Sequence, residues 1–179
     1  GIASIVAPAV GVGWTIWPVA VMATLAALLG WVVSLLVRAP RSPKSTRSAW
    51  AWAAPVAVGT GALLMTLRLV RGIPSADLFV QSFDNAFHLA AARYILDVGN
   101  ASPWAVSTLG LPEEGSFFYP TGWHALVALV AGASGSAITV ASNACLIVVA
   151  CLIWPLGVVL LTRTLFGARP PLLVAAGAI

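Results

Sequence analysis

Residues 81–100 read QSFDNAFHLAAARYILDVGN and predict one short helix around which the rest of the chain is organised. Asp84 and His88 are four residues apart, so their side chains share one face of that helix. Ser82, or Asp84 itself, can cap the start. Gly99 can end the helix because glycine tolerates the left-handed conformation. Apolar residues cover the remaining surface, so we expect the helix to lie against an apolar layer with one polar face toward water.

The composition predicts an all-α, polytopic membrane protein. The chain has 179 residues, of which 60% are hydrophobic and 8% charged, with a mean hydropathy of +1.00. Soluble domains carry about 25% charged residues. The apolar runs are longer than the strands of a membrane barrel, which leaves helices as the spanning elements. The basic residues lie in short loops beside these runs, a pattern of membrane topology that argues against a nucleic-acid partner.

Three apolar runs are long enough to cross a bilayer, at about residues 18–37, 51–70 and 137–161. Residues 2–13 are apolar but interrupted by proline and glycine, and we expect them to end an earlier span or to form a re-entrant piece. A truncated apolar stretch begins at residue 172. We therefore expect residues 1–179 to be part of one larger transmembrane domain.

The charge distribution predicts the topology. The loop 38–48 carries four basic residues and no acid, so the positive-inside rule places it in the cytoplasm and places the loop 72–120 outside the plasma membrane. Arg68 and Arg71 lie at the far end of the second span, where long side chains can snorkel to the interface.

Every carboxylate of the chain lies in the loop 72–120. The five acids are Asp77, Asp84, Asp97, Glu113 and Glu114, and the two histidines, His88 and His124, lie in this loop or just beyond it. Polar residues prefer water, but that preference does not explain why the cytoplasmic loop has no acid. Titratable groups gathered on one side of the membrane favour a functional site there.

Residues 119–133 form an apolar segment that is short for a span. It would reach about 22 Å as a helix, against about 30 Å of hydrocarbon. If it crossed, Arg163 and Arg169 after the last span would lie outside; if it does not cross, they lie in the cytoplasm, as the positive-inside rule prefers. We therefore predict a juxtamembrane or half-inserted helix, with His124 near the outer surface and not buried.

Three segments, in this order, resemble the GT-C class of membrane glycosyltransferases: FDNAFHLAAARYILDVGN, FFYPTGWHALVAL and LLTRTLFG. In that class the first large extracytoplasmic loop carries an early catalytic Asp, a juxtamembrane helix and a YPP-like turn, and a later span ends in an RxLFG-like cytoplasmic motif. The DxxFH, SPW and YPTGWH pieces are closer still to an uncharacterised actinobacterial family of multi-pass proteins. The resemblance covers residues 51–179. Asn85 stands where the class often has a second acid, and YPT replaces YPP.

The resemblance implies a GT-C-like fold and transfer of a sugar from a polyprenyl-phosphate donor to a cell-envelope acceptor, either glycan or protein. It places Asp84 as the catalytic base, or with His88 as a ligand of a divalent cation. The residues assigned to substrate binding are His88, Arg93, Glu113, Glu114, Tyr119, Trp123 and His124.

Each assignment has a structural alternative. Asp84 can act only as a helix cap, the histidines as ordinary interfacial residues, Glu113 and Glu114 as a solvated turn, and Trp123 as an interface anchor. At the level of the protein, the alternatives are a non-catalytic GT-C-like scaffold and a transporter. A transporter needs ionisable groups at mid-membrane depth.

Overall fold

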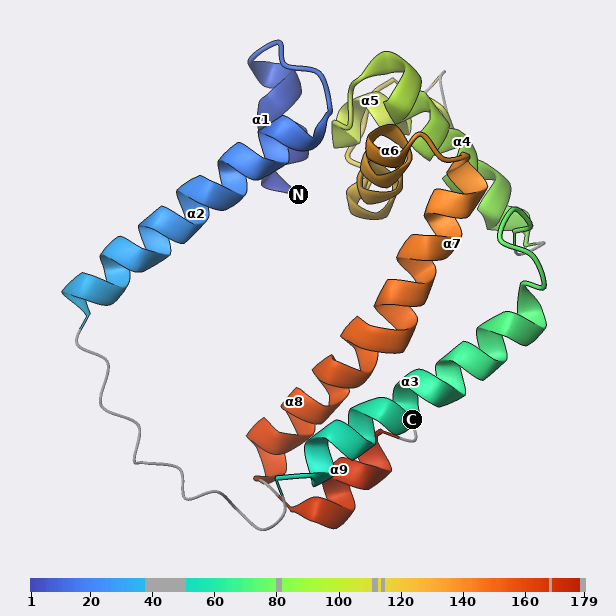
Figure 1. The fold of residues 1–179 in the computed structure, drawn as a ribbon. Helices are drawn as coiled ribbons and strands as arrows, with labels where there is room; N and C mark the ends of the chain where they lie inside the picture. Colours follow the sequence, from blue (N-terminus) through green and yellow to red (C-terminus); the bar gives the residue numbers. More distant parts are fainter. Residues whose placement is uncertain (38–50, 80–81, 111–112, 114, 168, 178–179) are drawn as a thin grey trace. The chain divides into compact units, whose positions relative to one another are not determined.

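The computed structural model describes residues 1–37, 51–79, 82–110, 113, 115–167 and 169–177, and throughout these ranges the regular structure is helical, with no strand (Figure 1). Three helical segments are long and apolar enough to cross a membrane: α2 (Ile16–Leu36), α3 (Ala53–Gly72) and the continuous stretch Ile138–Phe166. They correspond to the three spans expected from the sequence. The all-helical class is thus confirmed, and three helical segments have the length and apolar composition that a membrane span needs.

The chain divides into two compact units. The first comprises residues 1–40 and 79–142 and holds α1 (Ile2–Ala9), α2, α4 (Phe83–Val98), α5 (Pro103–Ser107), α6 (Gly122–Ser134) and the start of α7 (Ile138–Val148). The second comprises residues 41–78 and 143–179 and holds α3, the rest of α7, the π-helical turn η2 (Val149–Ile153), α8 (Trp154–Phe166) and α9 (Pro170–Ala176).

The core of the first unit lies between α4 and α6. Ala91 and Ile95 of α4 and Ala125 and Ala128 of α6 are buried together. Trp14 packs on this core and donates its indole N–H to the carbonyl oxygen of Ala125 at 2.9 Å. The residues around Trp14 are therefore attached to the α4–α6 core.

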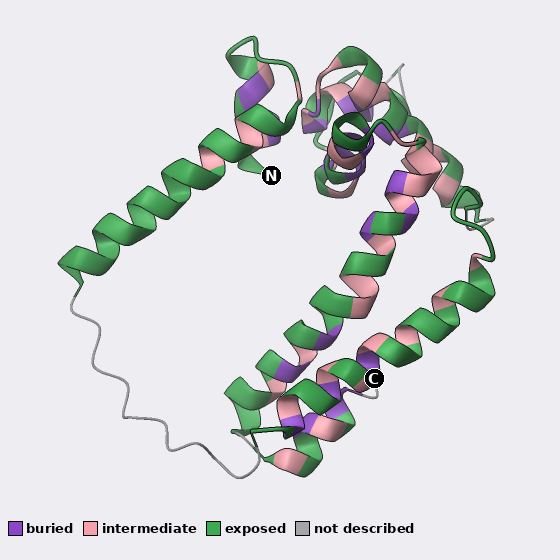
Figure 2. Ribbon diagram, viewed as in Figure 1, coloured by how far each residue is buried: buried purple, intermediate pink, exposed green. Residues whose placement is uncertain are grey.

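Helix α2 of the same unit has no buried residue at all (Figure 2). Its side chains are almost entirely apolar, with Leu, Val and Trp exposed along its length. Such a surface is unfavourable in water and suits a helix whose surroundings are lipid or other membrane helices.

Helix α4 begins and ends close to the predicted positions. Ser82 is the N-cap residue in an extended conformation, but its side chain makes no capping hydrogen bond. Gly99 ends the helix with a φ of 68°, in the left-handed region that favours glycine. The helix therefore starts without a side-chain cap, and Asp84 lies in its first turn.

The second unit is held together by small residues. Ala53, Ala57 and Gly61 recur every four residues along one face of α3, and all three are buried. Small residues let membrane helices approach closely. A Cβ atom at residue 177 would lie 2.0 Å from the carbonyl oxygen of Ala57, so the contact requires glycine at that position.

The third candidate span contains a π-helical turn directly before Pro155. The irregularity lies at Val149–Ile153, within about one turn of the proline. Proline has no N–H and its ring clashes with the carbonyl four residues before it, here that of Cys151. A wider turn at this point accommodates both effects.

We expect Gly61→Ala to destabilise the second unit, because the added Cβ would lie 2.8 Å from the carbonyl oxygen of Gly177 and 3.1 Å from Cβ of Pro155. Overpacking of this kind costs about 1–3 kcal/mol. Gly59→Ala is the matched control on the same helix, since its Cβ would meet nothing within 4 Å. Unfolding of both variants in detergent measures the difference. Equal stability of the two variants would contradict the packing described for α3.

Candidate functional site

Residues 115–121, which lead into α6, are attached by hydrogen bonds to α5 and to the residues before α5. Ser107 Oγ accepts a hydrogen bond from the backbone N–H of Phe117 at 3.1 Å. Thr121, which is buried, donates its hydroxyl to the carbonyl oxygen of Ala101 at 2.8 Å. These bonds determine where Tyr119 and the first turn of α6 lie relative to α4.

The two histidines of the chain meet in the first unit. Nδ1 of His88, on α4, lies 2.9 Å from Nε2 of His124, on α6, within hydrogen-bond distance. His124 is only 3% exposed, so the expectation that it lies near the surface and unburied is wrong. The packing of α6 against α4 turns this face of α6 inward, and His124 with it.

Burial also decides which nitrogen carries each proton. Nδ1 of His124 is buried and has no partner among the described residues. If His88 donated the shared hydrogen bond, neutral His124 would carry its proton on Nδ1, as a buried N–H without an acceptor. Orphaned buried N–H groups are rare and cost about 1–3 kcal/mol. We therefore assign the donor to Nε2 of His124, which leaves the proton of His88 on Nε2.

This assignment gives His88 a definite chemical character. Its Nδ1 accepts from His124, and its Nε2–H is left to donate to a ligand. Burial, with a smaller contribution from His88, lowers the pKa of His124 to about 4, so His124 is neutral at pH 7. His88 is thus a half-buried hydrogen-bond donor whose ring is oriented by a buried neutral neighbour.

Aromatic rings surround the histidine pair. The ring of Phe87 meets that of Tyr119 edge-on at 5.3 Å between centroids, and it lies 6.2 Å from the ring of His124. The ring centroids of Tyr119 and His124 are 5.7 Å apart. We call Phe87, His88, Tyr119 and His124 the ring cluster. Its apolar members restrict water around His124, which is the physical cause of the lowered pKa.

Asp84 lies one helical turn before His88 and is exposed. Its carboxylate makes no hydrogen bond or ion pair with any described residue, and it does not cap α4. A negative charge in the first turn is favourable with the helix dipole, but only by a few tenths of a kcal/mol at an exposed site. The structure gives Asp84 no other stabilising role.

The other predicted substrate-binding residues are not part of the ring cluster. Arg93 forms an exposed ion pair with Asp97 at 2.8 Å, and this partner raises the pKa of Arg93. Glu113 is exposed, and Glu114 lies outside the described residues. Trp123 is half-buried and makes none of the ring contacts of the cluster. Of the predicted set, the structure brings together His88, Tyr119 and His124.

Phe87 and Thr121 were not predicted as site residues. Phe87 is the phenylalanine of the DxxFH motif, directly before His88. Thr121 lies within the YPTGWH motif and fixes the start of α6. Membership in these two motifs was the available signal for both residues.

The described residues contain no group of three or more His, Cys, Asp or Glu side chains that could hold a metal ion. A metal-bound histidine normally donates its second ring N–H to an acceptor. Nδ1 of His124 has no such acceptor among the described residues, so His124 does not fit metal ligation through Nε2. With Nδ1 accepting from His124 and Nε2 protonated, His88 has no free lone pair for a metal ion. A cation at Asp84 would take its remaining ligands from the substrate or water.

A family model matches the chain over residues 1–179, and the chain belongs to that family, DUF6541, a family of unknown function. Neither a curated protein nor a solved structure matches the chain significantly. The function therefore has to be argued from the residues of the site.

We expect the stability of the protein to fall between pH 6.5 and pH 4 through His124. In this window the unfolded chain binds a proton at His124 that the folded state does not bind, so stability decreases as the pH decreases. The contribution is at most about 3 kcal/mol. The measurement is thermal unfolding of wild type and His124→Phe in detergent across this range. The wild type should lose more stability than the variant on acidification, and parallel pH profiles would contradict the buried neutral imidazole.

Proposed function

We propose that this member of the DUF6541 family is a membrane glycosyltransferase that moves a sugar from a polyprenyl-phosphate donor to an extracytoplasmic cell-envelope acceptor. The observation that carries the proposal is the state of Asp84. Its carboxylate is exposed, has no partner among the described residues, and lies one turn from a histidine oriented by a buried second histidine. A carboxylate and an oriented donor are the two groups that the transfer reaction needs.

Asp84 and His88 each have one role in the proposed reaction. The acceptor hydroxyl oxygen forms a bond to the anomeric carbon while the bond from that carbon to the donor phosphate breaks. Asp84 takes the proton that the acceptor hydroxyl loses. Nε2–H of His88 donates a hydrogen bond to an oxygen of the departing phosphate, where negative charge develops.

The remaining residues of the ring cluster position these groups. His124 orients His88, and Phe87 and Tyr119 provide an apolar wall on which a sugar ring or the first part of a prenyl chain can lie. A divalent cation, when bound, would neutralise phosphate charge. Asp84 is the described carboxylate best placed to hold it.

Two observations weigh against the alternatives. A scaffold in which Asp84 serves only as a helix cap would show a capping hydrogen bond, and α4 has none. A transporter would use polar groups within its spans for its cargo. Asn143, a buried polar side chain in the third candidate span, instead donates to the carbonyl oxygens of Ala76 and Leu78, at 2.9 and 2.5 Å.

We expect Asp84→Asn to reduce sugar transfer by about 10²–10⁴-fold, because the substitution removes the proton acceptor and keeps the shape of the side chain. The assay uses the full-length protein in membranes with labelled polyprenyl-phosphate sugars. Asp97→Asn is the matched control, since Asp97 is an exposed acid of the same helix that pairs with Arg93. Wild-type turnover by Asp84→Asn would rule out the assignment and favour a scaffold.

We also propose that the protein is a multi-pass plasma-membrane protein with residues 72–120 outside the cell and 38–48 in the cytoplasm. In a background without Cys145 and Cys151, an impermeant thiol reagent should label Ser116→Cys, which is exposed, in intact cells. Ser42→Cys, which lies outside the described residues, should be labelled only after lysis. The reverse pattern would overturn the orientation.

A further inference from the structure

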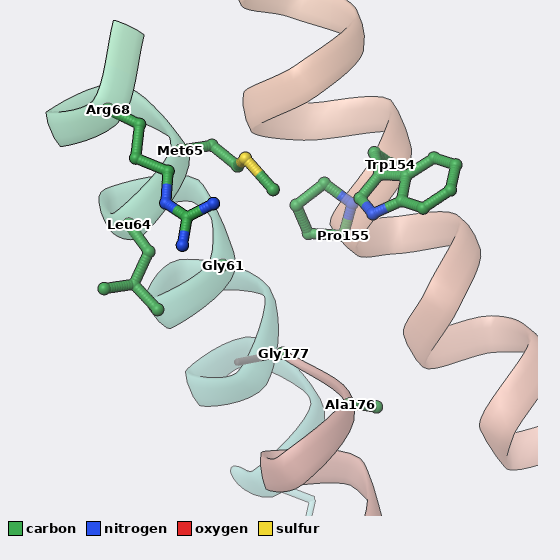
Figure 3. Close-up of a pocket in the computed structure, with 8 residues that line it drawn as sticks. All are labelled: Gly61, Leu64, Met65, Arg68, Trp154, Pro155, Ala176 and Gly177. Atoms are coloured by element: carbon green, nitrogen blue, oxygen red, sulfur yellow. The ribbon is translucent and has the colours of Figure 1, made fainter. Parts of the chain in front are cut away.

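A small cavity lies within the second unit, between α3, α8 and the end of α9 (Figure 3). Its volume is about 60 Å³, and its walls include Gly61, Leu64, Met65 and Arg68 of α3 and Trp154 and Pro155 of α8. A water-sized group needs about 15 Å³. The cavity is therefore large enough to admit a small polar group.

Arg68 is the charged residue of this wall, and it lies within a candidate membrane span. Four residues separate it from the end of α3 at Gly72, about 6 Å along the axis. Side chains of a helix lean toward its N-terminus. Figure 3 shows the guanidinium of Arg68 reaching back beside Leu64, toward the middle of the helix. The side chain thus leads the charge away from the nearer end of the span.

No counter-charge for Arg68 is found among the described residues. The side chain makes no hydrogen bond or ion pair with any of them. All acids of the chain lie between residues 77 and 114, outside the candidate spans. The acid of the second unit, Asp77, accepts a hydrogen bond from Ser75. An unpaired cation inside a bilayer is unfavourable and marks a functional position by default.

The rest of the cavity wall indicates what kind of anion would enter. Leu64, Met65 and Pro155 are apolar, and Trp154 is 55% exposed on the surface of its span. A free phosphate ion would find one charged donor and otherwise apolar surface. An amphiphile can place its phosphate at the guanidinium and its chain along the exposed apolar faces of α3 and α8.

We propose that this cavity binds the phosphate headgroup of an anionic membrane lipid, with Arg68 holding the phosphate. The planar guanidinium forms paired hydrogen bonds to phosphate oxygens and stays charged in apolar surroundings. The close contacts of Gly61 and Gly177 keep the floor of the cavity in place. The site is distinct from the ring cluster and does not depend on the proposed sugar transfer.

The test measures equilibrium binding of radiolabelled lipids to the full-length protein in neutral detergent. The probes are phosphatidylglycerol, polyprenyl phosphate, zwitterionic phosphatidylcholine and inorganic phosphate. The variants are Arg68→Gln and Arg68→Lys. Arg71→Gln is the matched control, because Arg71 lies on the same helix and does not line the cavity. A monodisperse elution profile and an unchanged melting curve confirm that each variant is folded.

We expect saturable binding of at least one of the two anionic lipids. Arg68→Gln should weaken it at least tenfold and Arg68→Lys less, while Arg71→Gln should stay within twofold of wild type. If Arg68→Gln does not fold, weaker binding by the charged Arg68→Lys variant alone still supports the paired contact. Wild-type affinity in Arg68→Gln, an equal loss in Arg71→Gln, or equally tight binding of inorganic phosphate or phosphatidylcholine would overturn the proposal.

Discussion

The packing of α4 against α6 is the interaction on which the candidate site depends. Alanines at the contact let the two backbones approach closely enough for His88 to reach His124. Larger residues at Ala91 or Ala125 would separate the helices, and the shared hydrogen bond would be lost with the separation. The site therefore depends on small side chains that are not themselves titratable, among them Ala91, one turn after His88, and Ala125, directly after His124.

The same principle holds the second unit together. Water does not drive helices together inside a bilayer, so close packing and interhelical hydrogen bonds must supply the attraction. Ala53, Ala57 and Gly61 provide the packing, and Asn143 provides hydrogen bonds from α7 to the segment that follows α3. Both units thus use small residues for contact and reserve polar groups for a few defined bonds.

The sequence predicted those features that follow from local chemistry. Hydropathy and length predict the three candidate spans, and Gly99 predicts the end of α4 because its conformation is decided locally. The burial of His124 and the edge-on contact between the rings of Phe87 and Tyr119 were not predicted. Both depend on the rotation of α6 about its axis relative to α4. Tertiary packing determines that rotation, and the spacing of residues along one helix does not.

The distribution of charge connects these observations. A glycosyl transfer that uses a lipid-linked donor needs water-accessible acid–base groups for the sugar and an apolar environment with a cation for a lipid phosphate. The exposed Asp84 beside the ring cluster meets the first requirement. Arg68 lies on a candidate span that contains no acid, and its guanidinium is a cation of the kind that the second requirement names. The two features lie in different units and are stabilised by separate contacts, so loss of one leaves the local structure of the other intact. Each feature can therefore be tested by its own variants, and the test of the proposed lipid site does not depend on the proposed sugar transfer.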